Sequence, residues 1–163
     1  MKTLLSLSAL LITLTLTAQS NTATWYLNDT SGNGIQSPTN TASGGYSTAM
    51  GRTTTASGTY STSMGKDTEA SGGASTAMGE GTTASEAAST AMGWRTTASG
   101  WASAAMGYQT EASSDYSTSM GDSTTASGVI STAIGYLSTA SGTVSTAMGW
   151  ITEASGDYST SMG

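Results

Sequence analysis

The chain has 163 residues, a formal net charge of −6, 36% hydrophobic residues, and neither Cys nor His. Much of the hydrophobic content is Ala, Phe is absent, and large aliphatic residues are scarce beyond residue 16. Such a chain cannot fill a thick globular core, but it can fill a very thin one. The acidic charge excludes a basic surface of the kind that binds nucleic acid or an anionic membrane. The lack of Cys excludes a disulfide framework and thiol chemistry.

Residues 1–18 are typical of a secretory signal peptide. Lys2 provides the positive start, residues 4–16 form a short apolar stretch, and Thr17 and Ala18 offer a small-residue cleavage site. The alternative is an uncleaved N-terminal anchor. Removal of the segment takes Lys2 with it and leaves 10 acidic residues against 4 − 1 = 3 basic ones, so we expect an exported chain with a net charge of −7.

Residues 19–40 form an N-terminal lead-in that lies outside any repeat. Its one compact apolar cluster is Trp-Tyr-Leu at residues 25–27, and turn-forming residues surround it. A stacked repeat must cover its first unit, because an open unit is an exposed sheet edge. The cluster is therefore interpreted as a short strand or cap over that unit. A ligand-binding aromatic pair is the alternative.

From residue 41 to residue 163 a fourteen-residue period organises the chain. The element S-T-A-M-G, first met at residues 47–51, returns without a slip until Gly163 and gives nine copies. Each unit consists of two related seven-residue halves, and a seven-residue period first suggests a heptad coiled coil. A helix is disfavoured, because each of the two Gly per unit would cost about 1 kcal/mol in a helix interior. A flexible linker is disfavoured too, because a linker does not need a strict repeat period. We therefore predict an all-β, parallel β-solenoid of about nine coils with two short strands per coil. Gly51 and Gly58 are expected at its bends, with positive φ or close backbone approach.

Alternation along the two strands assigns the faces of each coil. The positions of Ser47, Ala49, Thr54 and Ala56 take only small residues and are predicted to point inward. The opposite positions carry Thr, Ser and three Glu on one side and a stripe of large apolar residues on the other. An exposed stripe of this length is typical of a buried interface, so several copies are expected to associate along it, in parallel and around a rotation axis. The stripe consists of Met50, Met64, Met78, Met92, Met106, Met120, Ile134, Met148 and Met162.

The repeat resembles that of a known family. Residues 131–142, S-T-A-I-G-Y-L-S-T-A-S-G, are similar to the pattern S-V-A-I-G-x-x-S-x-A-x-G of the Hep/Hag head repeats in YadA-like trimeric autotransporter adhesins. This resemblance spans residues 41–163. It implies a left-handed parallel β-roll, a homotrimer with the Met50 series in its core, and display on the bacterial outer membrane. It also implies a stalk and a membrane anchor beyond Gly163.

The sequence offers little support for catalysis. The acidic residues stand singly, no base accompanies the serines, and no calcium-solenoid or nucleotide-binding motif is found, so we expect no enzyme, no cofactor and no metal. Exposed aromatic residues at the turns form the candidate binding surface, because aromatic rings stack on sugars, prolines and other proteins. The alternative is that they only pack over neighbouring turns. These residues are Trp94, Trp101, Tyr108, Tyr136 and Trp150.

The expected function is attachment to extracellular matrix, host cells or other surfaces by a non-catalytic adhesin head. Two alternatives stay open. Regular Ser and Thr on the face of Thr55 and Ser57 could bind ice, although Glu69, Glu111 and Glu153 interrupt that face. The same repeat could also form the shaft of a secreted or phage-type fibre.

Overall fold

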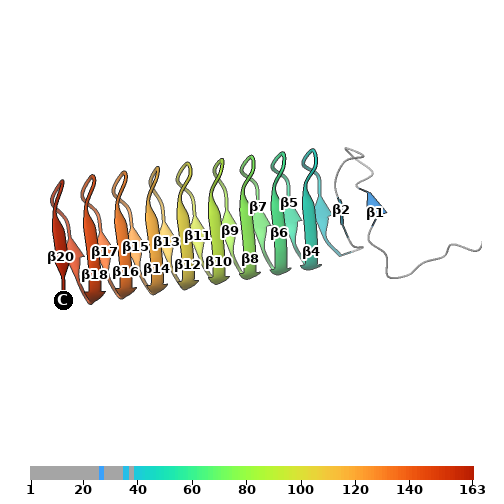
Figure 1. Cartoon of the computed structure of the whole chain (residues 1–163). Coiled ribbons are helices and arrows are strands. Elements are labelled where there is room, and N and C mark those ends of the chain that lie inside the picture. Colours follow the sequence, from blue (N-terminus) through green and yellow to red (C-terminus); the bar gives the residue numbers. More distant parts are fainter. Residues whose placement is uncertain (1–25, 28–34, 37–38) are drawn as a thin grey trace, which may run out of the picture.

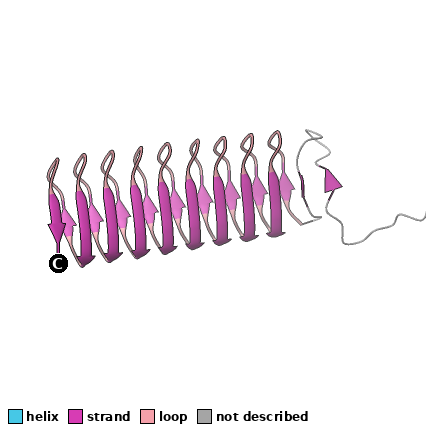
Figure 2. Cartoon of the chain, in the orientation of Figure 1, coloured by secondary structure: helices cyan, strands magenta, loops and turns pink. Residues whose placement is uncertain are grey.

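The computed structural model describes residues 26–27, 35–36 and 39–163. The predicted signal peptide and Trp25 lie outside the described residues. The described part of the chain contains strands and turns and no helix (Figure 2). Each fourteen-residue unit forms one coil made of a long strand and a short strand, so the predicted all-β parallel solenoid of about nine coils is confirmed.

The long strands begin at the second residue of S-T-A-M-G and end one residue after its glycine, except the last, which ends at Met162. They are β4 (Thr48–Arg52), β6 (Thr62–Lys66), β8 (Thr76–Glu80), β10 (Thr90–Trp94), β12 (Ala104–Tyr108), β14 (Thr118–Asp122), β16 (Thr132–Tyr136), β18 (Thr146–Trp150) and β20 (Thr160–Met162). The short strands are β3 (Thr41–Ala42), β5 (Thr55–Ala56), β7 (Glu69–Ala70), β9 (Thr83–Ala84), β11 (Thr97–Ala98), β13 (Glu111–Ala112), β15 (Thr125–Ala126), β17 (Thr139–Ala140) and β19 (Glu153–Ala154).

Two parallel sheets run the length of the stack. The long strands pair in register with their neighbours, so that Met92 lies between Met78 and Met106. The short strands form the second sheet, and its Ala positions are likewise aligned. In Figure 1 the long strands run downward at the front and the short strands run upward behind them, while the chain advances from right to left. The coil is therefore left-handed.

The interior of each coil is narrow and is filled by small side chains from both sheets. All the Ala residues of the short strands are buried, as are the inward-facing Ser and Ala of the long strands from β4 to β18. The prediction that Ser47, Ala49, Thr54 and Ala56 point inward is confirmed, and their equivalents follow them. Since two sheets this close leave no room for a larger side chain, the volume of Ala and Ser sets the thickness of the molecule.

The interior also contains hydroxyl groups, and their pairing differs between coils. In the coil of β6, Ser63 Oγ lies 2.7 Å from Thr68 Oγ1 and donates to Thr68 O over 3.0 Å. Ser119 makes the same pair with Thr124. In four coils where Ala occupies the Ser63 position, the facing Thr hydroxyl has no partner, at Thr54, Thr82, Thr96 and Thr110. Thr152 also faces an Ala, but it donates to Ser138 Oγ over 2.9 Å. A Ser hydroxyl at this position therefore provides a partner for a buried Thr hydroxyl that otherwise lacks one in most coils.

The prediction that Gly51 and Gly58 lie at the bends is correct for Gly58, which lies in the connection at residues 57–60, and wrong for Gly51. Gly51 lies inside β4 with φ of 131°, and a Cβ there would overlap the backbone of Gly65 in the next coil. Gly58 is likewise required by close approach to Gly72, without positive φ. The bends themselves use non-glycine residues in the left-handed region, at Thr53 (φ 57°), at Tyr60 (φ 62°) and at nearly all their equivalents. At Gly51 and its equivalents, glycine is therefore needed for the spacing of the coils rather than for the direction of the chain.

A short hairpin precedes the first complete coil. β1 (Tyr26–Leu27) pairs antiparallel with β2 (Ile35–Gln36), which in turn pairs with β4 through Ile35 and Thr48. The strand predicted at residues 25–27 is thus present at Tyr26 and Leu27, but it pairs with β2, and β2 rather than β1 pairs with the first long strand. Asn40 starts the interior column, since its side chain accepts from Thr54 N (3.1 Å) and donates to Gly51 O (2.9 Å).

Candidate functional site

The stack presents four surfaces, two faces and two edges. The long-strand face carries the outward residues of β4 to β20, and the short-strand face those of β3 to β19. We name the two-residue corners at 52–53 and their equivalents the lower turns, and the four-residue connections at 57–60 and their equivalents the upper turns, after their places in Figure 1. Any binding function must use one of these four surfaces.

The Met column lies on the long-strand face. Its members pair in register from β4 to β20, with Ile134 between Met120 and Met148. None of them enters the interior: Met50 and Met148 are just over a third exposed, Met162 is exposed, and the others are half-buried against one another. The sequence-derived orientation of these side chains therefore agrees with the structure. Their role as an oligomer interface stays a prediction.

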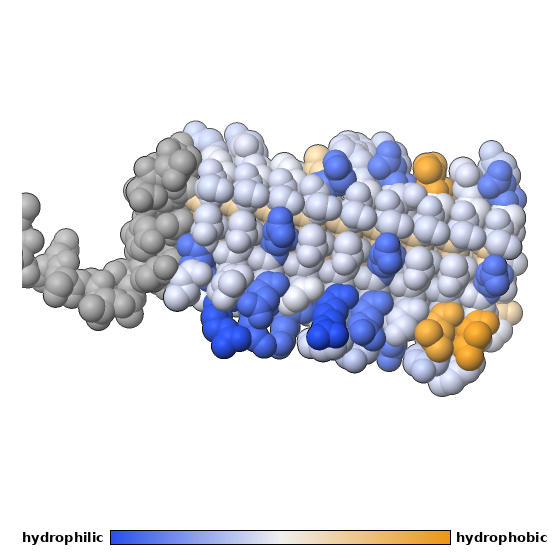
Figure 3. All heavy atoms as spheres, turned by 180° about the vertical axis from the view of Figure 1, so that it is seen from behind, coloured by the Kyte–Doolittle hydropathy of each residue, from blue (hydrophilic) through white to orange (hydrophobic). Residues whose placement is uncertain are grey.

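The short-strand face is a lattice of Thr and Ser interrupted by carboxylates. Glu69, Glu111 and Glu153 stand at every third coil, and Thr occupies the same position in the coils between them. No more than two Thr coils are therefore adjacent. Figure 3 shows this face as a pale polar surface with separate hydrophilic spots. Such interruption disfavours an ordered water lattice over the face.

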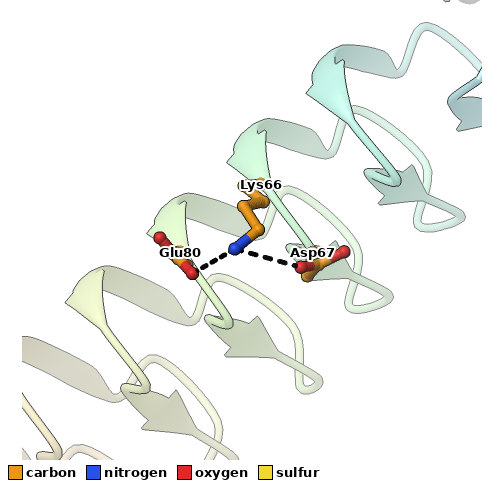
Figure 4. A network of polar contacts seen from close by, with 3 residues as sticks. All are labelled: Lys66, Asp67 and Glu80. Carbon is orange, nitrogen blue, oxygen red and sulfur yellow. Dashed lines mark hydrogen bonds and ion pairs between the residues drawn. The ribbon is translucent and has the colours of Figure 1, made fainter.

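The lower turns near the N-terminal end are charged. Lys66 Nζ lies 2.5 Å from Glu80 Oε1 in the next coil and 4.0 Å from Asp67 Oδ2 (Figure 4). The hydrogen bond from Lys66 holds the pKa of Glu80 below its ordinary value, against a smaller opposing effect of burial. Since these side chains are well exposed, the pair contributes little to stability.

The lower turns further along are aromatic. Trp94 stacks on Tyr108 with ring centroids 4.6 Å apart, and the Arg95 guanidinium lies 4.2 Å from the Trp94 ring centroid. Tyr136 and Trp150 stack in the same way at 4.2 Å. Each of these rings stacks one face on its neighbour, and Trp94 also contacts Arg95, whereas Trp150 stays 66% exposed. This geometry favours the packing interpretation for Trp94 and Tyr108.

The fifth predicted aromatic residue, Trp101, lies on the upper turns, away from the other four. It meets Tyr116 edge-on at 4.9 Å, and Tyr46 stacks on Tyr60 at the first two coils. The five predicted residues therefore do not form one surface. Sequence reasoning omitted exposed apolar residues at the turns, although the same period places them at variable turn positions. They include Tyr46, Tyr60, Tyr116, Val129, Ile130, Leu137, Val144, Ile151 and Tyr158.

The described residues offer no enclosed site. They form no pocket and no group of three or more acidic side chains that could hold a metal ion. A helix of membrane-spanning length and hydropathy is also not found among them. The features that distinguish one coil from another are thus all on the open faces and turns.

Comparison with known proteins agrees with this architecture. The family model described as YadA head domain repeat (2 copies) matches residues 42–68, 70–96, 98–124, 126–150 and 140–163. No curated protein matches the chain significantly. The matched segments cover the whole stack from the first buried Ala of β3 to Gly163, which is well over half of the chain. The chain therefore belongs to the family of YadA head domain repeats, a structural adhesin-type repeat module.

Proposed function

We propose that this protein is a cell-surface adhesin head, exported and displayed on the bacterial surface, which attaches to extracellular matrix, host cells or other surfaces. Three copies associate in parallel along the Met column. The observation that carries the proposal is that eight Met and one Ile stand in register on the outside of a coil whose interior accepts only small side chains. A large apolar side chain on a strand face that is otherwise Thr has no partner within its own coil.

The dimensions support association along the whole face. Nine coils spaced about 4.8 Å apart give a column roughly 40 Å long. A contiguous apolar surface of this size on a soluble chain marks an interaction site. Because the side chains repeat in register, two or three copies side by side meet the same residues at every level, and rotation about an axis closes such an assembly.

Attachment would then use the faces and turns that stay outside the assembly. A stiff stack presents a given turn position at intervals of one coil, and three copies multiply each weak contact. The loss of one contact leaves the others bound, so modest individual affinities suffice for retention on a surface.

The assembly is tested by sedimentation of the purified chain at micromolar concentration. We expect a trimer for the natural sequence and dissociation for the variant Met92→Glu/Met106→Glu. The matched control is Thr83→Glu/Thr97→Glu on the short-strand face, where Glu already stands at Glu69 and Glu111. A natural chain that sediments as a monomer, or equal behaviour of the two variants, would refute association along the Met column.

Attachment is tested with cells that display the protein. Cells that display the natural chain should adhere to surfaces coated with matrix proteins, while cells displaying the Met92→Glu/Met106→Glu variant should adhere less. Thermal hysteresis of the purified protein tests the ice-binding alternative. Ice-growth inhibition together with no adhesion to any coated surface would replace the adhesin proposal.

A further inference from the structure

The upper turns of the C-terminal half carry a column of apolar side chains at their last position. Tyr116, Ile130, Val144 and Tyr158 stand in four consecutive coils and are 53%, 52%, 39% and 79% exposed. At about 4.8 Å per coil, the column spans roughly 14 Å. The three preceding coils carry Ala at the same position, namely Ala74, Ala88 and Ala102. The fold therefore accepts a small residue there, and large residues stand in two groups, Tyr46 and Tyr60 in the first two coils and the four-residue column further along.

Two of these side chains stand in a backbone conformation that their residue type disfavours. Ile130 has φ of 58° and Val144 has φ of 56°. A β-branched residue in the left-handed region is an outlier, since its Cβ crowds the backbone. Backbone hydrogen bonds hold the conformation, because Ile130 N donates to Asp115 O over 2.9 Å and Val144 N to Val129 O over 2.8 Å. Since every coil uses this conformation at its bends, the fold fixes the backbone at these two residues and directs their side chains outward.

Carboxylates bound the column at both ends. Asp115 precedes Tyr116 and Asp157 precedes Tyr158, so the two stand three coils apart. Their Oδ1 atoms accept hydrogen bonds from the backbone N of the preceding coil, at Trp101 and Thr143, each over 2.9 Å. Within residues 39–163 the upper turns contain no Lys or Arg. The four apolar residues and the two carboxylates therefore form an acidic and apolar edge. A ligand that complements this edge carries basic and apolar groups.

We propose that this edge binds an extended polypeptide segment of another protein in which one apolar side chain lies between two Lys or Arg side chains. Side chains on one face of an extended strand recur at about 6.6–6.8 Å, so cations four residues apart are about 13 Å apart and match the two carboxylates. The apolar residue midway between them then meets Ile130 and Val144. A sugar fits less well, because the centre of the edge is aliphatic and offers no open ring face. The inference rests on the proposed attachment function and specifies the ligand chemistry for it.

The site is tested by NMR on the full chain in its native assembly, with labelled Ile and Val methyl groups. The probe is a synthetic peptide of seven residues in which Thr alternates with Lys, Leu and Lys, and the control peptide carries Glu in place of both Lys. We expect shifts of Ile130 and Val144 with the Lys peptide only, weakening as salt is added. Ile134 on the long-strand face and Ile151 on the lower turns stay unshifted. Unmoved Ile130 and Val144 signals, or equal shifts with both peptides, would overturn the proposal.

Two pairs of substitutions separate binding from folding. Asp115→Asn/Asp157→Asn should weaken peptide binding at least tenfold. Ile130→Asn and its control Ile151→Asn replace β-branched residues of similar φ by a residue that tolerates the left-handed region, so both should melt at or above the natural temperature. Only Ile130→Asn should lose peptide binding. If Ile130→Asn lowers the melting temperature, Ile130 serves folding and the site is refuted. A trimer that adheres but does not bind the peptide refutes this site alone.

Discussion

The paired and unpaired hydroxyls of the interior predict opposite effects for one substitution at two equivalent positions. Thr68 and Thr96 occupy the same place in two coils, and both are buried. Thr68 Oγ1 lies 2.7 Å from Ser63 Oγ, whereas Thr96 Oγ1 has no partner because Ala91 stands at the Ser63 position. Val has nearly the shape of Thr, so replacement changes the hydroxyl and little else.

The magnitudes follow from the cost of an unsatisfied buried group. Thr68→Val removes one hydrogen bond, worth about 0.5–1.5 kcal/mol net, while Ser63 Oγ keeps its bond to Thr68 O. Thr96→Val removes a hydroxyl whose burial without a partner costs about 1–3 kcal/mol. We therefore expect Thr68→Val to destabilise by about 1 kcal/mol and Thr96→Val to stabilise by about the same amount. The difference of about 2 kcal/mol corresponds to roughly 4–8 °C in melting temperature.

Thermal and denaturant unfolding followed by circular dichroism measures both variants. All proteins must be compared at one chain concentration, because association of copies adds to apparent stability. Ala91→Ser offers an independent check, since it should provide Thr96 with the partner that Thr68 has. If both Val variants shift stability in the same direction, the hydroxyl pairing does not govern the interior and the reasoning is wrong.

Three further substitutions test other parts of the fold. Gly93→Ala should abolish ordered coils, because its Cβ would overlap the backbone of the next coil. Gly73→Ala should leave the circular dichroism spectrum unchanged, because its Cβ would make only an ordinary contact with Thr59 O at 3.9 Å. Glu80→Gln should lower the melting temperature slightly at pH 7, because the pKa of Glu80 is lower in the folded state than its ordinary value of 4.5 and the charged form therefore stabilises the fold. This stabilisation is lost as the pH falls from 4.5 through the lowered pKa, so the difference between the two proteins should vanish there. Asn40→Ala should destabilise the chain by about 1–3 kcal/mol in denaturant unfolding, because it leaves the buried Thr54 N without its acceptor.

The faces of the coil could be predicted from the sequence because side-chain volume alone decides them. A position that holds Ala in every copy, as Ala56 does, can only be the inside of a narrow coil, and a position that holds Met cannot. The period fixes the register as well, so the neighbours of Met92 in the stack follow from counting. These conclusions require no knowledge of backbone angles.

The residues that turn the chain and the orientation of the exposed rings could not be predicted in this way. Glycine at Gly51 suggested a turn, but it is required because the next coil approaches too closely for a Cβ. The turns instead use residues such as Tyr60, whose left-handed conformation is stabilised by a hydrogen bond from its N to Gly45 O in the preceding coil. Counting residues does bring Trp94 beside Tyr108. It does not tell whether their rings stack on each other or face outward.

The direction of the hydrogen bonds between coils has a mechanical consequence. Bonds such as those from Thr48 N to Ser61 O and from Thr62 N to Ser75 O join successive coils along the long axis. Tension applied between the ends of the chain therefore separates coils one after another, starting from an end, rather than shearing a whole sheet at once. One coil of fourteen residues occupies about 4.8 Å in the stack and reaches about 46–50 Å when extended. Each released coil therefore lengthens the chain by more than 40 Å, while the coils behind it keep their shape.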